Sequence, residues 1–164
     1  MSISRQSLRG RVLLAAVLIA AVTPASAQNI VNQSTPSASS GTFANGPTPP
    51  SGSRSADGNL FLTYTRPGVN TGTYTGPYVQ ELEVVIHPNG RTNFRGTTTC
   101  VCTVEGQTGT LVIRFQGTGM AGAQFSGSYV VVGGTDGLEN LRGQGTFAGA
   151  GLTGTYSGRH HFDP

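Results

Sequence analysis

Alternation of apolar and polar side chains is the main pattern over the last two thirds of this chain. In the run 78–87, Leu82 and Ile86 would share one face of an extended strand, whereas Glu81 and Glu83 would share the other. A period of two is typical of a half-buried β-strand, because successive side chains point to opposite faces. The same period recurs in the runs 60–66, 91–105, 111–116, 125–131, 141–148 and 152–162. The pattern predicts about seven or eight short strands.

Turn signals separate these runs. Asn89-Gly90 accepts the positive φ angles of a tight hairpin, and Pro67-Gly68 is expected to end the first strand. Gly-rich segments follow at 117–122 and 133–137. No amphipathic helical period of ten residues follows the N-terminal apolar run. Successive antiparallel hairpins over about 105 residues indicate an up-and-down barrel or a sandwich.

Glycines on the predicted inner face favour the barrel over the sandwich. In the last run, Gly154 and Gly158 share a face with Tyr156 and His160, and the run before it has the same arrangement. Glycines between large side chains indicate a sharply coiled sheet, in which backbones bend or approach closely. We therefore expect an all-β fold, a small antiparallel up-and-down β-barrel of about eight strands over residues 58–164. A barrel of this size encloses its own side chains or one small ligand.

Two parts of the chain resemble a bacterial family of unknown function. The segments GGTDGLENLRGQGTF (133–147) and GTYSGRHHFDP (154–164) resemble the end of the family called domain of unknown function 3224, and FRGTTTC (94–100) with GQTGTLVIRFQGTG (106–119) also fits it. That family is similar to the barrel superfamily of plant allene oxide cyclases and dirigent proteins. The resemblance implies an eight-stranded antiparallel barrel with a central cavity. It implies no reaction, because the catalytic residues of those proteins cannot be placed one by one on this chain.

The first 27 residues have the parts of a secretory signal peptide. Three arginines precede an apolar run at 12–22, and Ala25-Ser26-Ala27 supplies a small-x-small cleavage pattern. The run is too short to span a bilayer, which takes about 20 residues as a helix. We expect cleavage after Ala27 and a secreted or periplasmic protein without a membrane span; an uncleaved membrane anchor is the alternative.

Residues 28–57 differ in composition from the rest of the chain. They are rich in Ser, Thr, Pro, Gly, Asn and Ala, and prolines recur at 36, 47, 49 and 50. Such a segment buries too little apolar surface to offset its ordering entropy. We expect a disordered linker here, between the signal peptide and the barrel domain.

The charge balance narrows the range of partners. The chain has 10 basic and 7 acidic residues and a formal net charge of +3. Three arginines lie in the predicted signal peptide, so the mature chain would be close to neutral. A nucleic-acid-binding surface needs clustered cations, and we therefore exclude nucleic acid as a partner. A charged fraction of 10% with 25 glycines favours a β-rich secreted domain over a cytosolic α/β enzyme.

Cys100 and Cys102 would lie on one face of a strand, with their Cα atoms roughly 6.5 Å apart. That separation is inside the limit of about 7 Å for a disulfide, although parallel Cβ directions are unfavourable for one. Three interpretations stay open: two buried core residues, a disulfide formed in an oxidising compartment, or a metal or catalytic pair. Zinc would need further ligands that the spacing does not supply. We expect no metal site and no cofactor.

Four residues are candidates for ligand binding: Tyr64, Tyr129, Tyr156 and His160. Their phase places the tyrosine hydroxyls on the inner face, where core packing is the alternative role. His160 would lie near a barrel rim, either as an acid or base near pH 7 or as a histidine held by its neighbours. The catalytic residues, if the protein has any, are unknown. Glu81 and Glu83 are either an acid-base pair or the solvated face of a strand.

The sequence predicts an exported barrel module that binds a small apolar ligand or a partner without catalysis. The alternative is a cyclase- or isomerase-type enzyme that steers a hydrophobic substrate in the barrel cavity. Homo-oligomer formation stays open. A solvent-reachable apolar pocket with Tyr, His or Glu would favour the enzyme. An interior filled by aromatic and aliphatic side chains would favour the module; these are Phe94, Ile113, Phe115, Phe125 and Phe147.

Overall fold

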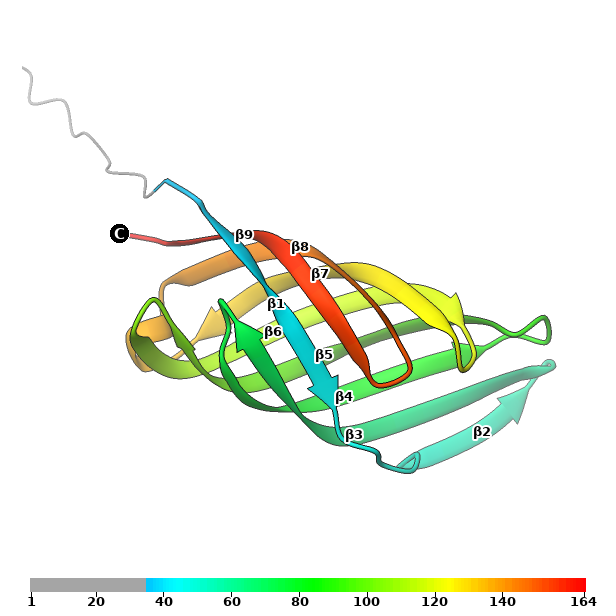
Figure 1. The fold of residues 1–164 in the computed structure, drawn as a ribbon. Coiled ribbons are helices and arrows are strands. Elements are labelled where there is room, and N and C mark those ends of the chain that lie inside the picture. The colour runs from blue at the N-terminus through cyan, green and yellow to red at the C-terminus, as the bar shows by residue number, and fades with distance from the viewer. Residues whose placement is uncertain (1–34) are drawn as a thin grey trace, which may run out of the picture. The chain divides into compact units, whose positions relative to one another are not determined.

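The computed structural model describes residues 35–164, which form a closed antiparallel barrel of eight strands with one additional strand (Figure 1). The strands are β1 (Ser37–Asn45), β2 (Gly52–Ala56), β3 (Asn59–Gly72), β4 (Gly76–Ile86), β5 (Arg91–Val104), β6 (Gln107–Met120), β7 (Gln124–Gly134), β8 (Leu141–Ala150) and β9 (Thr153–Phe162). A short 3-10 helix, η1 (Asp136–Leu138), lies between β7 and β8. The predicted all-β barrel is confirmed. The predicted signal peptide lies outside the described residues.

Strands β3 to β9 follow one another around the wall, each paired with the next in the sequence. Tight turns make this possible. At the turn from β5 to β6, Glu105 and Gly106 have φ angles of 51° and 79°, as a two-residue type I′ hairpin requires. Gly90 has a φ of 79° in the turn where Asn-Gly predicted a hairpin. The turn chemistry therefore sets the up-and-down order of the strands.

Strand β1 closes the barrel, and this corrects the prediction of a disordered linker over residues 28–57 for its described part, residues 35–57. It pairs with β9 on one side and with β3 on the other (Figure 1). Strand β2 also lies in that stretch and pairs with the first half of β3. The small, polar composition of this stretch suggested disorder, but β1 is held by backbone hydrogen bonds to strands on both of its edges. Small side chains are needed where aromatic rings from neighbouring strands pack against it. A Cβ at Gly41 would overlap the buried ring of Tyr156.

A second correction concerns Pro67, which was expected to end its strand. Strand β3 continues through it to Gly72. Strand β1 pairs with β3 from Gly68 onward, and β2 pairs with β3 up to Thr63. Pro67 lies between these two pairings, so its missing N–H removes no bond to β1 or β2. Its carbonyl accepts a hydrogen bond from Gly46 N–H at 2.7 Å.

Inward-facing glycines lie beneath aromatic rings from neighbouring strands. A Cβ at Gly96 would stand 2.6 Å from Phe115 Cζ, and one at Gly158 would stand 2.7 Å from the hydroxyl of Tyr129. Real Cβ atoms do not approach other atoms so closely. The glycines that favoured a barrel therefore provide the space in which the rings pack flat against the wall.

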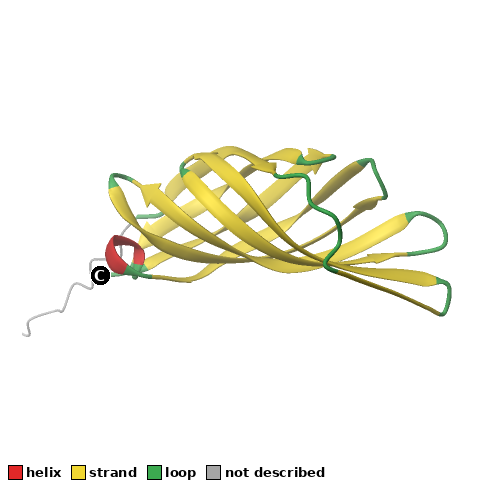
Figure 2. Cartoon of the chain, turned by 90° about the horizontal axis from the view of Figure 1, so that it is seen from below, coloured by secondary structure: helices red, strands yellow, loops and turns green. Residues whose placement is uncertain are grey.

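The two ends of the barrel are built differently. At one end lies η1 (Figure 2), and its Leu138 is fully buried. Val104, Leu111 and Leu141 are also fully buried and belong to the same core cluster. At the other end are the turns after β2, β4, β6 and β8. Within residues 35–164, no helix has the length and apolar character needed to cross a membrane.

Candidate functional site

A cavity of about 310 Å³ lies inside the barrel. Its wall includes residues 121–123 and 151 of two turns at the end opposite η1, so the cavity lies toward that end. Much of the lining is apolar: Phe43, Leu62, Leu82, Val84, Ile86, Phe94, Phe125 and Phe147. The volume is near the lower limit of pockets that hold small organic molecules, which is about 300 Å³.

Polar side chains form one row across the cavity wall. Arg66 on β3, Gln80 on β4 and Thr98 on β5 are direct partners in the strand register and all line the cavity. Arg66 Nε donates to Gln80 Oε1 at 2.8 Å, and Gln80 Nε2 donates to Thr98 Oγ1 at 3.5 Å. The row therefore holds the guanidinium of Arg66 at a defined position inside the barrel.

Arg66 carries a charge that no carboxylate neutralises. Its terminal nitrogens Nη1 and Nη2 have no hydrogen-bond or ion-pair partner among residues 35–164, and no Asp or Glu lines the cavity. Burial lowers the pKa of Arg66, against the opposing influence of Tyr78 and Tyr64. An arginine stays protonated nonetheless, because its ordinary pKa is far above neutral pH. The cavity thus contains a partly buried, unpaired cation.

Tyr78 and Asn45 form a second polar group beside this row. The Tyr78 hydroxyl donates to Asn45 Oδ1 at 2.8 Å, and Asn45 Nδ2 donates to the carbonyl of Leu152 at 3.2 Å. Burial raises the pKa of Tyr78 to about 12, with the Arg66 charge acting in the opposite direction. Tyr78 is therefore neutral at physiological pH, and Arg66 carries the charge of the cavity.

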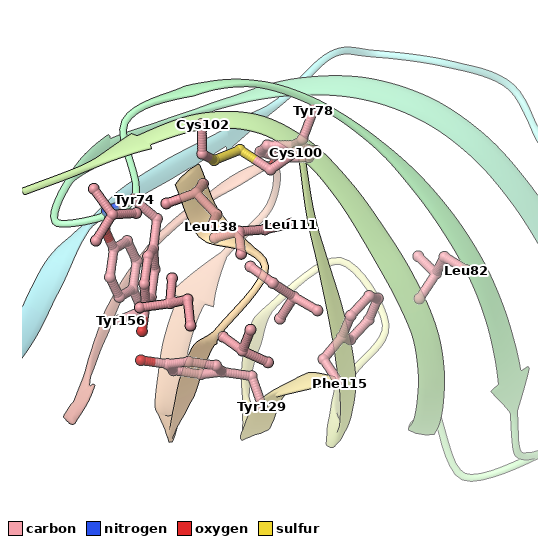
Figure 3. Packing of buried hydrophobic residues seen from close by; sticks show 14 residues of the cluster. Tyr74, Tyr78, Leu82, Cys100, Cys102, Leu111, Phe115, Tyr129, Leu138 and Tyr156 are labelled. Atoms are coloured by element: carbon pink, nitrogen blue, oxygen red, sulfur yellow. A yellow bond between two sulfur atoms is a disulfide. The ribbon is translucent and has the colours of Figure 1, made fainter. Parts of the chain in front are cut away.

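Three of the four residues predicted to bind ligand line the cavity: Tyr64, Tyr129 and Tyr156. Tyr129 and Tyr156 lie at the side nearer η1, where their hydroxyls are used within the protein. The Tyr156 hydroxyl accepts the Tyr74 N–H and donates to the Thr71 carbonyl, each at 2.9 Å. Its ring stacks on Tyr74 with centroids 5.4 Å apart (Figure 3). Burial raises the pKa of Tyr156. The rings of Tyr129 and Tyr156 therefore form the wall of the cavity on the side nearer η1. Tyr64 lies beside Arg66.

His160 does not line the cavity. It is 2% exposed, and its Nε2 lies 3.0 Å from Oε1 of Glu105 in the turn after β5. Its ring packs edge-on against Tyr74 at 6.1 Å, and its Nδ1 is buried without a hydrogen-bond partner. His160 lies toward the end of the barrel that carries η1, beside the β5–β6 turn. His160 joins β9 to the β5–β6 turn instead of facing a ligand.

The structure joins Cys100 and Cys102 by a disulfide (Figure 3). Both residues face the core, with exposed fractions of 0% and 2%. Their Cα atoms are 5.4 Å apart, closer than the spacing expected of a regular strand and well suited to a disulfide. The bond lies at the η1 side of the polar row, where Asn70 Nδ2 is 4.0 Å from Cys100 Sγ.

The outer carboxylates do not converge on a site. Glu81 and Glu83 are exposed on the outer face of β4, and Glu83 Oε2 pairs with Arg95 at 2.8 Å across the neighbouring strand. Both side chains of that pair are largely exposed, so the arrangement matches a solvated face. Across residues 35–164, no group of three or more His, Cys, Asp or Glu side chains has the arrangement of a metal site.

Sequence reasoning missed the polar residues of the cavity. A signal for Arg66 was present, because the period of two in the first strand places it on the same face as Leu62 and Tyr64. Asn45 gave no signal, since it lies in the segment expected to be disordered. The period of two in the run 78–87 also places Gln80 on the same face as Leu82 and Ile86, but its bond to Arg66 depends on strand register, which the sequence did not determine.

Comparisons with known proteins agree with the fold. The model of the family "Protein of unknown function (DUF3224)" matches residues 40–159, well over half of the chain, so the chain belongs to this family. One solved structure is that of a protein with unknown function from the DUF3224 family from Shewanella oneidensis MR-1. It is 17% identical, covers 79% of this chain and 99% of its own, and superposes with a TM-score of 0.61. A search of curated proteins found no match.

Proposed function

We propose that this member of the DUF3224 family is an exported module that holds a small, largely apolar ligand in its barrel cavity without catalysing a reaction. One observation carries the binding part of the proposal: a cavity of about 310 Å³ with apolar walls and a few inward polar groups. Its tyrosines were expected of an enzyme, so the preference for binding without catalysis rests on the acid-base candidates that lie outside the cavity. Pockets for small molecules have this composition, because apolar walls supply affinity and a few polar groups supply orientation. The signal-like pattern of residues 1–27 and the disulfide support export, since disulfides persist in oxidising compartments.

The placement of the acid-base candidates supports binding over catalysis. His160 is sealed against Tyr74 and Glu105, away from the cavity. Glu81 and Glu83 are exposed on the outer face. A general acid or base must come within hydrogen-bond reach of the reacting atom, and none of these three residues reaches the cavity.

A cyclase- or isomerase-type enzyme is the second candidate. One observation favours it: Tyr64 and the charged Arg66 lie beside apolar walls, an arrangement that can fold and orient a flexible hydrophobic substrate. The resemblance of the family to allene oxide cyclases and dirigent proteins points in the same direction. In this case the bound molecule would leave the cavity with its bonds rearranged.

A native mass spectrum of the full chain tests the proposal. We expect a species heavier than the polypeptide, whose extra mass disappears on denaturation. Replacing Val84 in the cavity wall by Trp should remove that extra mass, because the larger side chain fills the space. Val79→Trp is the control, since Val79 is exposed on the outer face of the same strand and its replacement should leave the extra mass unchanged. Extra mass that survives in the Val84→Trp variant would contradict a cavity site. If an apolar molecule is added to the protein and is released in a chemically altered form, that result would support the enzyme.

A further inference from the structure

We propose that Arg66 binds the carboxylate of the ligand, so that the cavity selects small carboxylates with an apolar tail. This inference rests on the proposed binding function and names the chemical class of its ligand. It starts from one feature: a cation directed into an apolar cavity, with no carboxylate of the described chain to neutralise it.

The electrostatics of the cavity favour an anionic ligand. A charge taken out of water is unfavourable unless it is paired and hydrogen-bonded. In residues 35–164, the one side-chain hydrogen-bond partner of Arg66 is the neutral Gln80. Its guanidinium also lies over the ring of Tyr64, 5.9 Å from the ring centroid, and this contact supplies no negative charge. The four ion pairs of this part of the chain all lie elsewhere. An anion bound beside Arg66 would supply the missing charge and satisfy its open donors.

The hydrogen bonding of Arg66 favours a carboxylate in particular. Gln80 Oε1 accepts a hydrogen bond from Arg66 Nε–H, with an N···O distance of 2.8 Å, and thereby orients the guanidinium. The two terminal nitrogens remain as parallel donors at the end of the side chain. Two parallel N–H groups match the two oxygens of a planar carboxylate, which is the strongest geometry of an arginine pair.

The surroundings of Arg66 provide space for an apolar tail. On the inward face of β3, Arg66 is followed toward the end opposite η1 by Tyr64 and Leu62, which spans about 13 Å at 3.3 Å per residue. Val84 and Phe94 are the register partners of Leu62 along β4 and β5, and both line the cavity. A linear tail attached to a carboxylate at Arg66 would therefore lie against apolar side chains over this length.

Calorimetric titration of the full chain with octanoate and 1-octanol at pH 8 tests the inference. The two probes share a tail, and octanoate alone carries the charge. We expect the wild-type protein to bind octanoate at least tenfold more tightly than octanol. Arg66→Gln and Arg66→Met should abolish this preference while leaving octanol affinity within about twofold, and Arg66→Lys should retain only part of it. Arg114→Gln, at an exposed arginine on the outer face of β6, should retain the full preference.

Each outcome separates the two proposals. Equal affinity for octanoate and octanol, or a preference that survives in both Arg66→Gln and Arg66→Met, overturns the role of Arg66; octanol binding would still support the ligand-binding module. Absence of binding by both probes contradicts both proposals. Octyl phosphate that binds more tightly than octanoate through Arg66 would overturn the choice of a carboxylate. A matching urea midpoint for Arg66→Met and the wild type ensures that lost binding is not lost folding.

Discussion

At the scale of single residues, the inward-facing glycines determine where the aromatic rings of the barrel interior can pack. Gly68 is the inward neighbour of Arg66 along β3, and its backbone is covered by the ring of Tyr78. Tyr78 in turn donates to Asn45 and lies beside the guanidinium of Arg66. The absence of one Cβ therefore sets the position of a ring that forms part of the cavity wall.

Replacing Gly68 by Ala should destabilise the protein by about 1–3 kcal/mol, because the added methyl overlaps the buried Tyr78 ring and overpacks the wall. The free energy of unfolding in urea measures the effect. Gly133→Ala is the matched control, since a Cβ there meets nothing within 4 Å. Equal midpoints for the two variants would show that the ring tolerates the methyl.

Stability should also fall at high pH, because burial raises the pKa of Tyr78 as well as those of Tyr74 and Tyr156. Burial raises the pKa of Tyr78 to about 12, above the value near 10 of an exposed tyrosine, so its folded state favours the neutral hydroxyl. The resulting stabilisation is complete below pH 10 and is lost as pH rises from about 10 to 12. Urea unfolding across this range, followed together with tyrosinate absorbance, should show this decline. Tyr78→Phe should make the decline shallower, and an unchanged slope would contradict the assignment to Tyr78.

At the scale of elements, the strands that the sequence predicted well are those with a strict period of two. Strand β5 runs from Arg91 to Val104 and was predicted over 91–105, because its large and polar side chains alternate almost without exception. Strand β1 was missed because its side chains are small and its stability comes from partners far along the chain. The alternation of apolar and polar side chains does not reveal such a strand, because it is held by backbone hydrogen bonds to β9 and β3.

Strand β1 should therefore be more sensitive to proline than β2. Residues 41–44 pair with β9 and β3 at once, so Thr42→Pro must remove a ladder hydrogen bond from the seam of the barrel. A lost bond with an unsatisfied partner should lower the free energy of unfolding by about 2 kcal/mol or more. Ser53→Pro in β2, which pairs only with β3 in the described chain, should have a smaller effect. The opposite order of the two urea midpoints would contradict the closing role of β1.

At the scale of the whole barrel, the disulfide contributes little to stability. It joins residues separated by two positions, so it closes a very short loop and restricts the unfolded chain only slightly. Within the described part of the chain, the core cluster contains twelve other buried residues besides the two cysteines. The barrel architecture was predictable because alternation, turns and inward glycines are all local. A central cavity was implied by the resemblance, but its volume and polar lining were not predictable, since they depend on how side chains from different strands fit together.

Refolding in the presence of a thiol reductant should therefore leave the barrel intact. The loop-closure model for a ring this short gives a loss of about 1.5 kcal/mol. Urea unfolding of oxidised and reduced protein, with far-ultraviolet circular dichroism as the signal, measures the difference. A reduced chain that fails to fold would show that the disulfide has a structural role beyond loop closure.

The closure of the barrel by β1 has a consequence for how the protein reaches its folded state. Ser37 pairs with His160, so the pairing of β1 with β9 cannot form until the last strand has been synthesised. The hairpins from β3 to β8 are local and can form early, whereas closure joins distant parts of the chain and is slow. Until β9 is present, the outer edges of the growing sheet stay open to other chains. The final ten-residue strand, β9, therefore determines when a newly made molecule stops being prone to aggregation.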